Sequence, residues 1–166
     1  ALSVIAVAQQ EFGDPREGLR LALALYDRAT GDEVRLNSAA QAAKAALMAG
    51  AEAHAELVTR FRAAYEKDRA RALPALALYE VMRADPSLPA ASLRPVLEAA
   101  VRAEPRNPLA LLRLAQVHQT LNEWSQAVPL WRRLADLRPD PDVQKALGKA
   151  LVKAGNLEEG MRISLA

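Results

Sequence analysis

The sequence predicts an all-α chain of about five antiparallel helical hairpins stacked as an α-solenoid. Alanine and leucine supply most of the hydrophobic residues, and aromatic residues make up only 4% of the 166 positions, which favours helices over strands. A turn-and-packing pattern recurs along the chain at intervals typical of helical hairpin arrays, about 34 residues. The length predicts one domain spanning residues 1–166.

The recurring pattern is a pair of small or apolar residues, a turn residue eight positions on, and a small residue five positions further. It occurs at Ile5-Ala6, Gly13 and Gly18; at Ala42-Ala43, Gly50 and Ala55; at Leu114-Ala115, Asn122 and Ala127; and at Leu147-Gly148, Gly155 and Gly160. A residue that tolerates positive φ ends the first helix, and a small residue near the start of the second lets the two backbones approach closely. The spacing therefore predicts four helix-turn-helix units.

The first two hairpins are predicted over residues 1–33 and 36–68. In the first, Asp14 and Pro15 supply the start signal of the second helix. In the second, small residues dominate the first helix. We expect His54 at the surface, near the start of the following helix and beside two glutamates.

The third hairpin, residues 74–106, is the least regular unit. Pro86 and Pro89 break its middle, and a small insertion is expected just before it. Pro95 and Pro129 lie one period apart. Both are expected in the first turn or so of their helices, where a missing N–H costs little.

The clearest hairpin covers residues 108–140, and a partial hairpin follows over residues 141–166. The residues expected to face inward in the clearest unit are Leu111, Leu114, Ala115, His118, Trp124, Ala127, Trp131 and Leu134. The two tryptophans lie seven positions apart on one helix face, so core packing is favoured over a ligand-stacking pair. In the last helix, Met161, Ile163 and Leu165 are expected to stay partly uncovered.

These units resemble the tetratricopeptide repeat family, whose pattern is a bulky residue, Leu-Gly or Leu-Ala, an aromatic residue, a glycine turn, a small residue, a second aromatic residue and a closing proline. The resemblance is strong over residues 108–160, where Pro139 closes a unit. It is fair over residues 1–30, where Gln9 replaces an aromatic residue, and weaker over residues 36–67. The resemblance implies a right-handed superhelix.

In such a solenoid the first helices of successive hairpins line a concave groove, so their residues away from the core are the candidates for partner binding. The candidates are Lys44, Arg83, Arg113, Gln116, Gln119, Lys145 and Lys149. This polar to basic lining suits a protein or extended peptide that carries acidic residues or a free carboxylate. The family's carboxylate clamp is not reproduced, because Lys149 stands in place of its asparagine. That these side chains are simply solvated is the open alternative.

No residue set with catalytic or metal-binding chemistry occurs in the sequence. Cysteine is absent, which excludes disulfides and thiol catalysis. The two histidines, His54 and His118, have no second ligand type at metal spacing, and the inward repeat position of His118 favours packing. Phosphate loops and nucleophile elbows are missing as well. We therefore expect no enzyme activity, no cofactor and no metal.

The charge balance, 22 basic against 20 acidic residues, does not indicate nucleic acid as a partner, because the two signs are interspersed along the chain. The longest apolar run, residues 1–8, is too short to span a bilayer and is interpreted as part of a helix. We expect a soluble protein without membrane insertion. The lack of cysteine suits both the cytoplasm and the periplasm.

The sequence leaves three functional hypotheses open. The first is a protein–protein interaction scaffold that uses the groove. The second is a structural segment that forms a homo-oligomer through an open C-terminal end, where apolar residues follow Gly160. The third is a regulatory domain of a larger protein, since the chain opens on Ala1 and is expected to be a processed form or an excised piece. Direct nucleic-acid binding ranks last.

Overall fold

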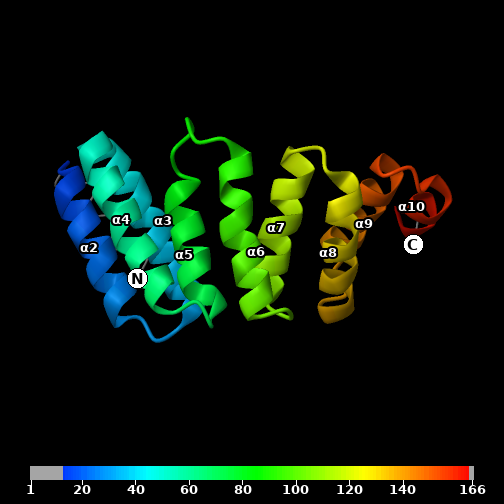
Figure 1. Cartoon of the computed structure of the whole chain (residues 1–166), viewed down its shortest axis with the longest axis horizontal. Coiled ribbons are helices and arrows are strands. Elements are labelled where there is room, and N and C mark those ends of the chain that lie inside the picture. The colour runs from blue at the N-terminus through cyan, green and yellow to red at the C-terminus, as the bar shows by residue number, and fades with distance from the viewer. Residues whose placement is uncertain (1–12, 165–166) are drawn as a thin grey trace. The chain divides into compact units, whose positions relative to one another are not determined.

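The computed structural model describes residues 13–164, and every regular element in that range is a helix (Figure 1). The all-α prediction is therefore confirmed. The chain divides into two compact units, Ala1–Pro89 and Ala90–Ala166, which are taken separately below. One domain spanning the whole chain stays a prediction. The expectations for residues 1–8, Gln9 and Leu165 concern positions outside the described residues.

The described part of the first unit consists of four helices that lie side by side (Figure 1). They are α2 (Pro15–Arg28), α3 (Asp32–Ala49), α4 (Ala51–Lys67) and α5 (Ala72–Met82). Helix α3 is central, because α2, α4 and α5 all pack against it. Its alanines make this close packing possible. Those with no exposed surface are Ala39, Ala42, Ala43, Ala45 and Ala46.

The described part of the second unit opens with a short 3₁₀ helix and continues with five α-helices. They are η1 (Ala90–Leu93), α6 (Arg94–Ala103), α7 (Pro108–Thr120), α8 (Trp124–Leu137), α9 (Pro141–Lys153) and α10 (Leu157–Ser164). Each α-helix packs against the next along the chain (Figure 1). The inward residues predicted for α7 and α8 are buried, except for Trp124, which is half-buried. The predicted core of this hairpin is confirmed.

The four predicted turn residues are the residues with positive φ in the described range. Their φ values are 58° at Gly13, 126° at Gly50, 58° at Asn122 and 95° at Gly155. After Asn122 and after Gly155, the next residue donates its N–H to the carbonyl five positions back, at 2.8 and 2.9 Å. This bond closes the C-terminus of the first helix while the chain reverses direction. The turn predictions are confirmed.

Gly50 makes a different turn, and the prediction that Ala55 packs against the first helix is wrong. The φ of 126° and ψ of 167° at Gly50 lie in a region that only glycine occupies readily. Helix α4 begins at the very next residue, whereas α8 and α10 begin two residues after their turn residues. Starting one residue early turns the faces of α4 by about 100°. Ala55 is therefore exposed, and His54 lies in its place, only 7% exposed.

The expected first-turn position is confirmed for Pro95 and wrong for Pro129. Pro95 is the second residue of α6. Helix α8 begins at Trp124, so Pro129 is its sixth residue and lies in the second turn. There it removes the N–H that would bond the carbonyl of Ser125. Ser125 is exposed, so water can hydrate that carbonyl.

Gly160 shows why the second helix needs a small residue. A Cβ atom at Gly160 would lie 2.7 Å from Cγ2 of Val152 and 2.9 Å from the carbonyl oxygen of Gly148. The second of these is a backbone atom of α9 and cannot rotate away. Glycine lowers helix stability by about 1 kcal/mol relative to alanine. Close packing of α10 on α9 therefore overrides helix propensity at this position.

We expect Gly160→Ala to lower the free energy of unfolding by about 1–3 kcal/mol, because overpacking exceeds the gain in helix propensity. Urea unfolding followed by circular dichroism measures the change. Gly31→Ala is the matched control, since Gly31 has negative φ and open space around an added Cβ; we expect a cost below about 1 kcal/mol there. A Gly160→Ala protein as stable as the unaltered chain would contradict the close approach.

Candidate partner-binding surface

The first helix of the second hairpin, α3, is enclosed on most sides and keeps one exposed stripe. Its members recur every three or four residues, the spacing of one helix face. They are Val34, Asn37, Gln41, Lys44 and Met48, all exposed except the half-buried Gln41. The neighbours of Lys44 on both sides, Ala43 and Ala45, have no exposed surface. The candidate Lys44 thus lies on the one face of α3 that packing leaves open.

Helix α9 has the same arrangement. The carboxylate of Asp140 accepts the N–H of Asp142 at 2.8 Å and caps the start of the helix. Lys145 and Lys149 follow on one face, one turn apart and exposed, while Leu147 between them is buried. Within the described residues neither lysine forms an ion pair. Both ammonium groups are therefore available to an incoming acidic group.

Helix α7 presents amide side chains and one cation. Arg113, Gln116 and Gln119 are half-buried on the face that packing leaves open. Nη1 of Arg113 donates to Oε1 of Gln116 at 3.3 Å. These side chains can offer hydrogen bonds to a peptide backbone, with less net charge than α9 offers.

Arg83 differs from the other candidates because it serves the fold. It is the residue that follows α5, and its Nε lies 2.5 Å from Oε2 of Glu80. Glu80 is only 5% exposed, so the guanidinium balances a buried carboxylate. The same guanidinium lies 5.8 Å from the centre of the Tyr79 ring. A change at Arg83 would alter the stability of α5 as well as any binding.

The candidate residues are distributed over both units. In the first unit, Lys44 lies on α3 and Arg83 directly follows α5, and these two helices pack against each other. In the second unit, α7 and α9 both pack against α8, and Lys145 and Lys149 share one face of α9. That these residues contact a partner stays a prediction.

Both histidines hold helices together. Nε2 of His54 lies 3.1 Å from the carbonyl oxygen of Val81 and donates to it, which satisfies one of the last carbonyls of α5. His118 is 7% exposed, so the packing role predicted for it is confirmed. The surface position predicted for His54 is wrong, because the early start of α4 turns this residue inward.

Glu123, just before α8, joins three helices of the second unit. Its Oε2 lies 2.6 Å from Nδ1 of His118 on α7, and its Oε1 accepts from Nη1 of Arg94 on α6 at 2.7 Å. The hydrogen bond to His118 is the main cause of a lowered pKa of the Glu123 carboxyl. Desolvation opposes this lowering of the pKa, and Arg94 adds to it. No sequence motif predicts the contact between His118 and Glu123. The only related signal in the sequence is the inward repeat position of His118.

The lowered pKa of Glu123 makes the free energy of unfolding of the second unit depend on pH. A carboxyl group whose pKa is lower in the folded state stabilises the fold fully above its ordinary pKa of 4.5. That contribution is lost as the pH falls through the folded-state pKa. We therefore expect the stability difference between the unaltered chain and Glu123→Gln to shrink from about pH 6 to about pH 3.

Urea unfolding at a series of pH values measures this difference. Glu158→Gln is the control for removing one negative charge, because Glu158 is exposed and makes no ion pair within the described residues. A Glu123→Gln difference that stays constant over the same pH range would count against the bond to His118.

Within residues 13–164 no cluster of three or more histidine, aspartate or glutamate side chains is placed to hold an ion. None of the described helices has the length and apolar character needed to cross a membrane.

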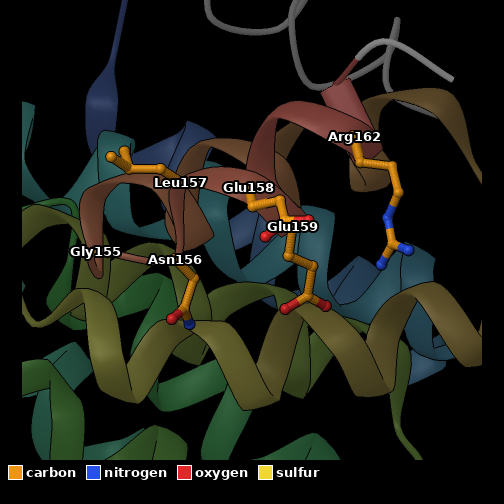
Figure 2. A pocket seen from close by; sticks show the side chains of 6 residues that line it. All are labelled: Gly155, Asn156, Leu157, Glu158, Glu159 and Arg162. Carbon is orange, nitrogen blue, oxygen red and sulfur yellow. The ribbon is translucent and has the colours of Figure 1, made fainter.

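A shallow hollow lies where α10 begins. It is lined by Gly155, Asn156, Leu157, Glu158, Glu159 and Arg162 (Figure 2). Glu159 forms an ion pair with Arg132 on α8 at 2.6 Å. Figure 2 shows the side chain of Leu157 pointing away from Glu159 and Arg162. The hollow thus has both apolar and charged lining residues.

Antiparallel hairpins, closed by positive-φ turns and leaving exposed stripes on their first helices, define a helical-repeat protein of the α-solenoid class. Known proteins agree with this class. Residues 90–150 match the tetratricopeptide repeat family. No curated protein matches the sequence of the chain.

Solved structures resemble almost the whole chain. A crystal structure of MamA has a TM-score of 0.61 at 13% identity, over 94% of this chain and 88% of that one. MamA from Desulfovibrio magneticus RS-1 has a TM-score of 0.60 at 17% identity, over 97% and 87%. A thermophilic TPR protein of Thermus thermophilus has a TM-score of 0.56 at 18% identity, over 95% and 83%. At these identities the likeness shows the fold.

Residues 90–150 thus match the tetratricopeptide repeat family, and the described helices have the fold of solved tetratricopeptide repeat proteins, so the resemblance seen in the sequence is confirmed.

Proposed function

We propose that the chain is a non-catalytic scaffold that binds a partner protein or extended peptide on the exposed stripes of its first helices. One observation carries the proposal. Lys44, Lys145 and Lys149 are exposed on helices that are otherwise largely buried, and within the described residues they form no ion pair. Neighbouring helices cover most of the remaining surface of α3 and α9. Their stripes are therefore the surfaces on which a partner can reach these helices.

An acidic partner fits the second unit best. Lys145 and Lys149 lie about 6 Å apart along the helix axis, so two carboxylates of one peptide can reach both ammonium groups. The amides of Gln116 and Gln119 on α7 can hydrogen-bond to a peptide backbone. Nucleic acid fits less well, because the acidic residues are nearly as numerous as the basic ones.

We expect Lys145→Glu together with Lys149→Glu to reduce partner capture by at least about tenfold, because charge repulsion replaces two charge-assisted contacts. Affinity capture with the tagged chain, followed by quantitative mass spectrometry, gives the set of partners that the double variant loses. Binding of a lost partner is then measured with purified proteins at two salt concentrations.

The matched control is Arg62→Glu with Lys67→Glu on α4. Both of these side chains are exposed and make no ion pair within the described residues, and the change in net charge is identical. The control should keep the partners and both variants should keep the helical circular dichroism signal. Equal loss in the two variants would show a general charge effect, and no loss in either would place binding away from α9.

A further inference from the structure

Helix α9 carries a third lysine in line with the two candidates described above. Lys145, Lys149 and Lys153 follow one another at intervals of four residues, and all three are exposed. Neighbours among them lie about 6 Å apart along the helix axis, so the three together span about 12 Å. Asp142, three positions before Lys145, bounds this positive surface at the start of the helix. These three lysines are called the lysine row below.

The lysine row departs from the charge pairing on other helices. On α2, Arg20 pairs with Glu17, and on α6, Arg94 pairs with Glu98. The lysines of the row form no ion pair with any described residue, and lysines four positions apart on a helix repel each other. The helix dipole favours a cation in the last turn, which accounts for Lys153 alone. A row that weakens its own helix and is not compensated inside the fold indicates a surface for recognition.

The place of the lysine row in the repeat keeps it exposed. Counted from the turn residue that follows each helix, Lys149 of α9 corresponds to Lys44 of α3. By the same count, Lys153 corresponds to Met48. Helix α3 has three packed neighbours, α2, α4 and α5, and both Lys44 and Met48 are still exposed. A full set of neighbouring helices therefore leaves these two repeat positions open.

The composition of α7 and α9 favours an extended peptide as the occupant. A helix docks through an apolar face, but none of the large exposed apolar side chains of the described residues lies on α7 or α9. Single-stranded nucleic acid needs aromatic side chains on which its bases stack, and neither of the two helices contains one. An extended acidic peptide needs only cations at a suitable spacing.

We propose that the lysine row binds an extended segment of a partner protein that carries acidic residues at three alternate positions. This inference rests on the function proposed above and adds the conformation of the partner segment and the spacing of its charges. Side chains on one side of an extended chain recur about every 6.7 Å, close to the spacing of about 6 Å between lysines of the row. Each carboxylate thus meets one ammonium group, whereas adjacent acidic residues point to opposite sides of the peptide.

Three labelled peptides of equal charge test the conformation and the spacing by fluorescence anisotropy at low salt. The first has glutamate at three alternate positions in a serine background, with proline at both ends to disfavour a helix. The second has the same composition with its glutamates four positions apart, and the third is an alanine-rich helical peptide with glutamates four positions apart. We expect the first to bind saturably below about 1 mM, and at least about fivefold more tightly than the other two.

Lys153→Gln tests the residue that the inference adds to the candidates. We expect it to weaken binding of the first peptide about two- to fivefold, because one of three charge pairs is lost. Lys67→Gln on α4 is the matched control, since Lys67 is exposed and has no ion pair among the described residues. The control should bind the first peptide as the unaltered chain does, and both variants should keep the helical circular dichroism signal.

Four results would overturn the inference. Absence of saturable binding of the first peptide would exclude the row as its site, and equal binding of the first and second peptides would show attraction by net charge alone. Tighter binding of the helical peptide would contradict the extended conformation, and tighter binding of a single-stranded oligonucleotide of equal charge would contradict a peptide as the occupant. The proposed function has a separate test, because it fails only if the double variant at Lys145 and Lys149 keeps its captured partners.

Discussion

Each hairpin depends on how its chain reverses. At Gly50, Asn122 and Gly155 a residue with positive φ follows the first helix, and the second helix must then return along the first at close range. Where the turn residue is followed two positions later by the second helix, as at Asn122 and Gly155, the fifth residue after it is Ala127 or Gly160 and is buried. The turn thus selects which face of the second helix meets the first, and the rest of the packing follows from that choice.

The enclosed first helices and the exposed stripes have the same origin. Helix α3 gives most of its surface to three neighbours, and its fully buried alanines show how closely they approach. What remains is one row of side chains. Both histidines support the packing, since His54 satisfies a carbonyl at the end of α5 and His118 contacts Glu123.

The features that a local steric rule determines could be predicted from the sequence. The four turn residues could be found because only glycine and asparagine tolerate positive φ readily. Gly160 could be found because a helical glycine needs a steric reason. The register of α4 could not be predicted. The sequence does not show that Gly50 has φ 126° and ψ 167° whereas Gly155 has φ 95°. Yet the helix after Gly50 begins one residue sooner than the helix after Gly155.

That one-residue shift exchanged the places of Ala55 and His54, and the bond from His54 to Val81 became visible only in three dimensions. The stripe positions on α3 and α9 were predictable, because helical periodicity separates buried from exposed faces. The contact among His118, Glu123 and Arg94 was not, since it joins three helices. The identity of the partner depends on side chains of another molecule, so periodicity alone does not predict it.

The turn at Asn122 tests the dependence of the hairpin on positive φ most directly. We expect Asn122→Gly to be at least as stable as the unaltered chain. We expect Asn122→Ala to be less stable than Asn122→Gly by about 1–2 kcal/mol, because the left-handed backbone conformation is strained for alanine and not for glycine. The measurement is the free energy of unfolding in urea for the three proteins. Equal stability of the alanine and glycine variants would contradict the claim that this backbone conformation closes the hairpin.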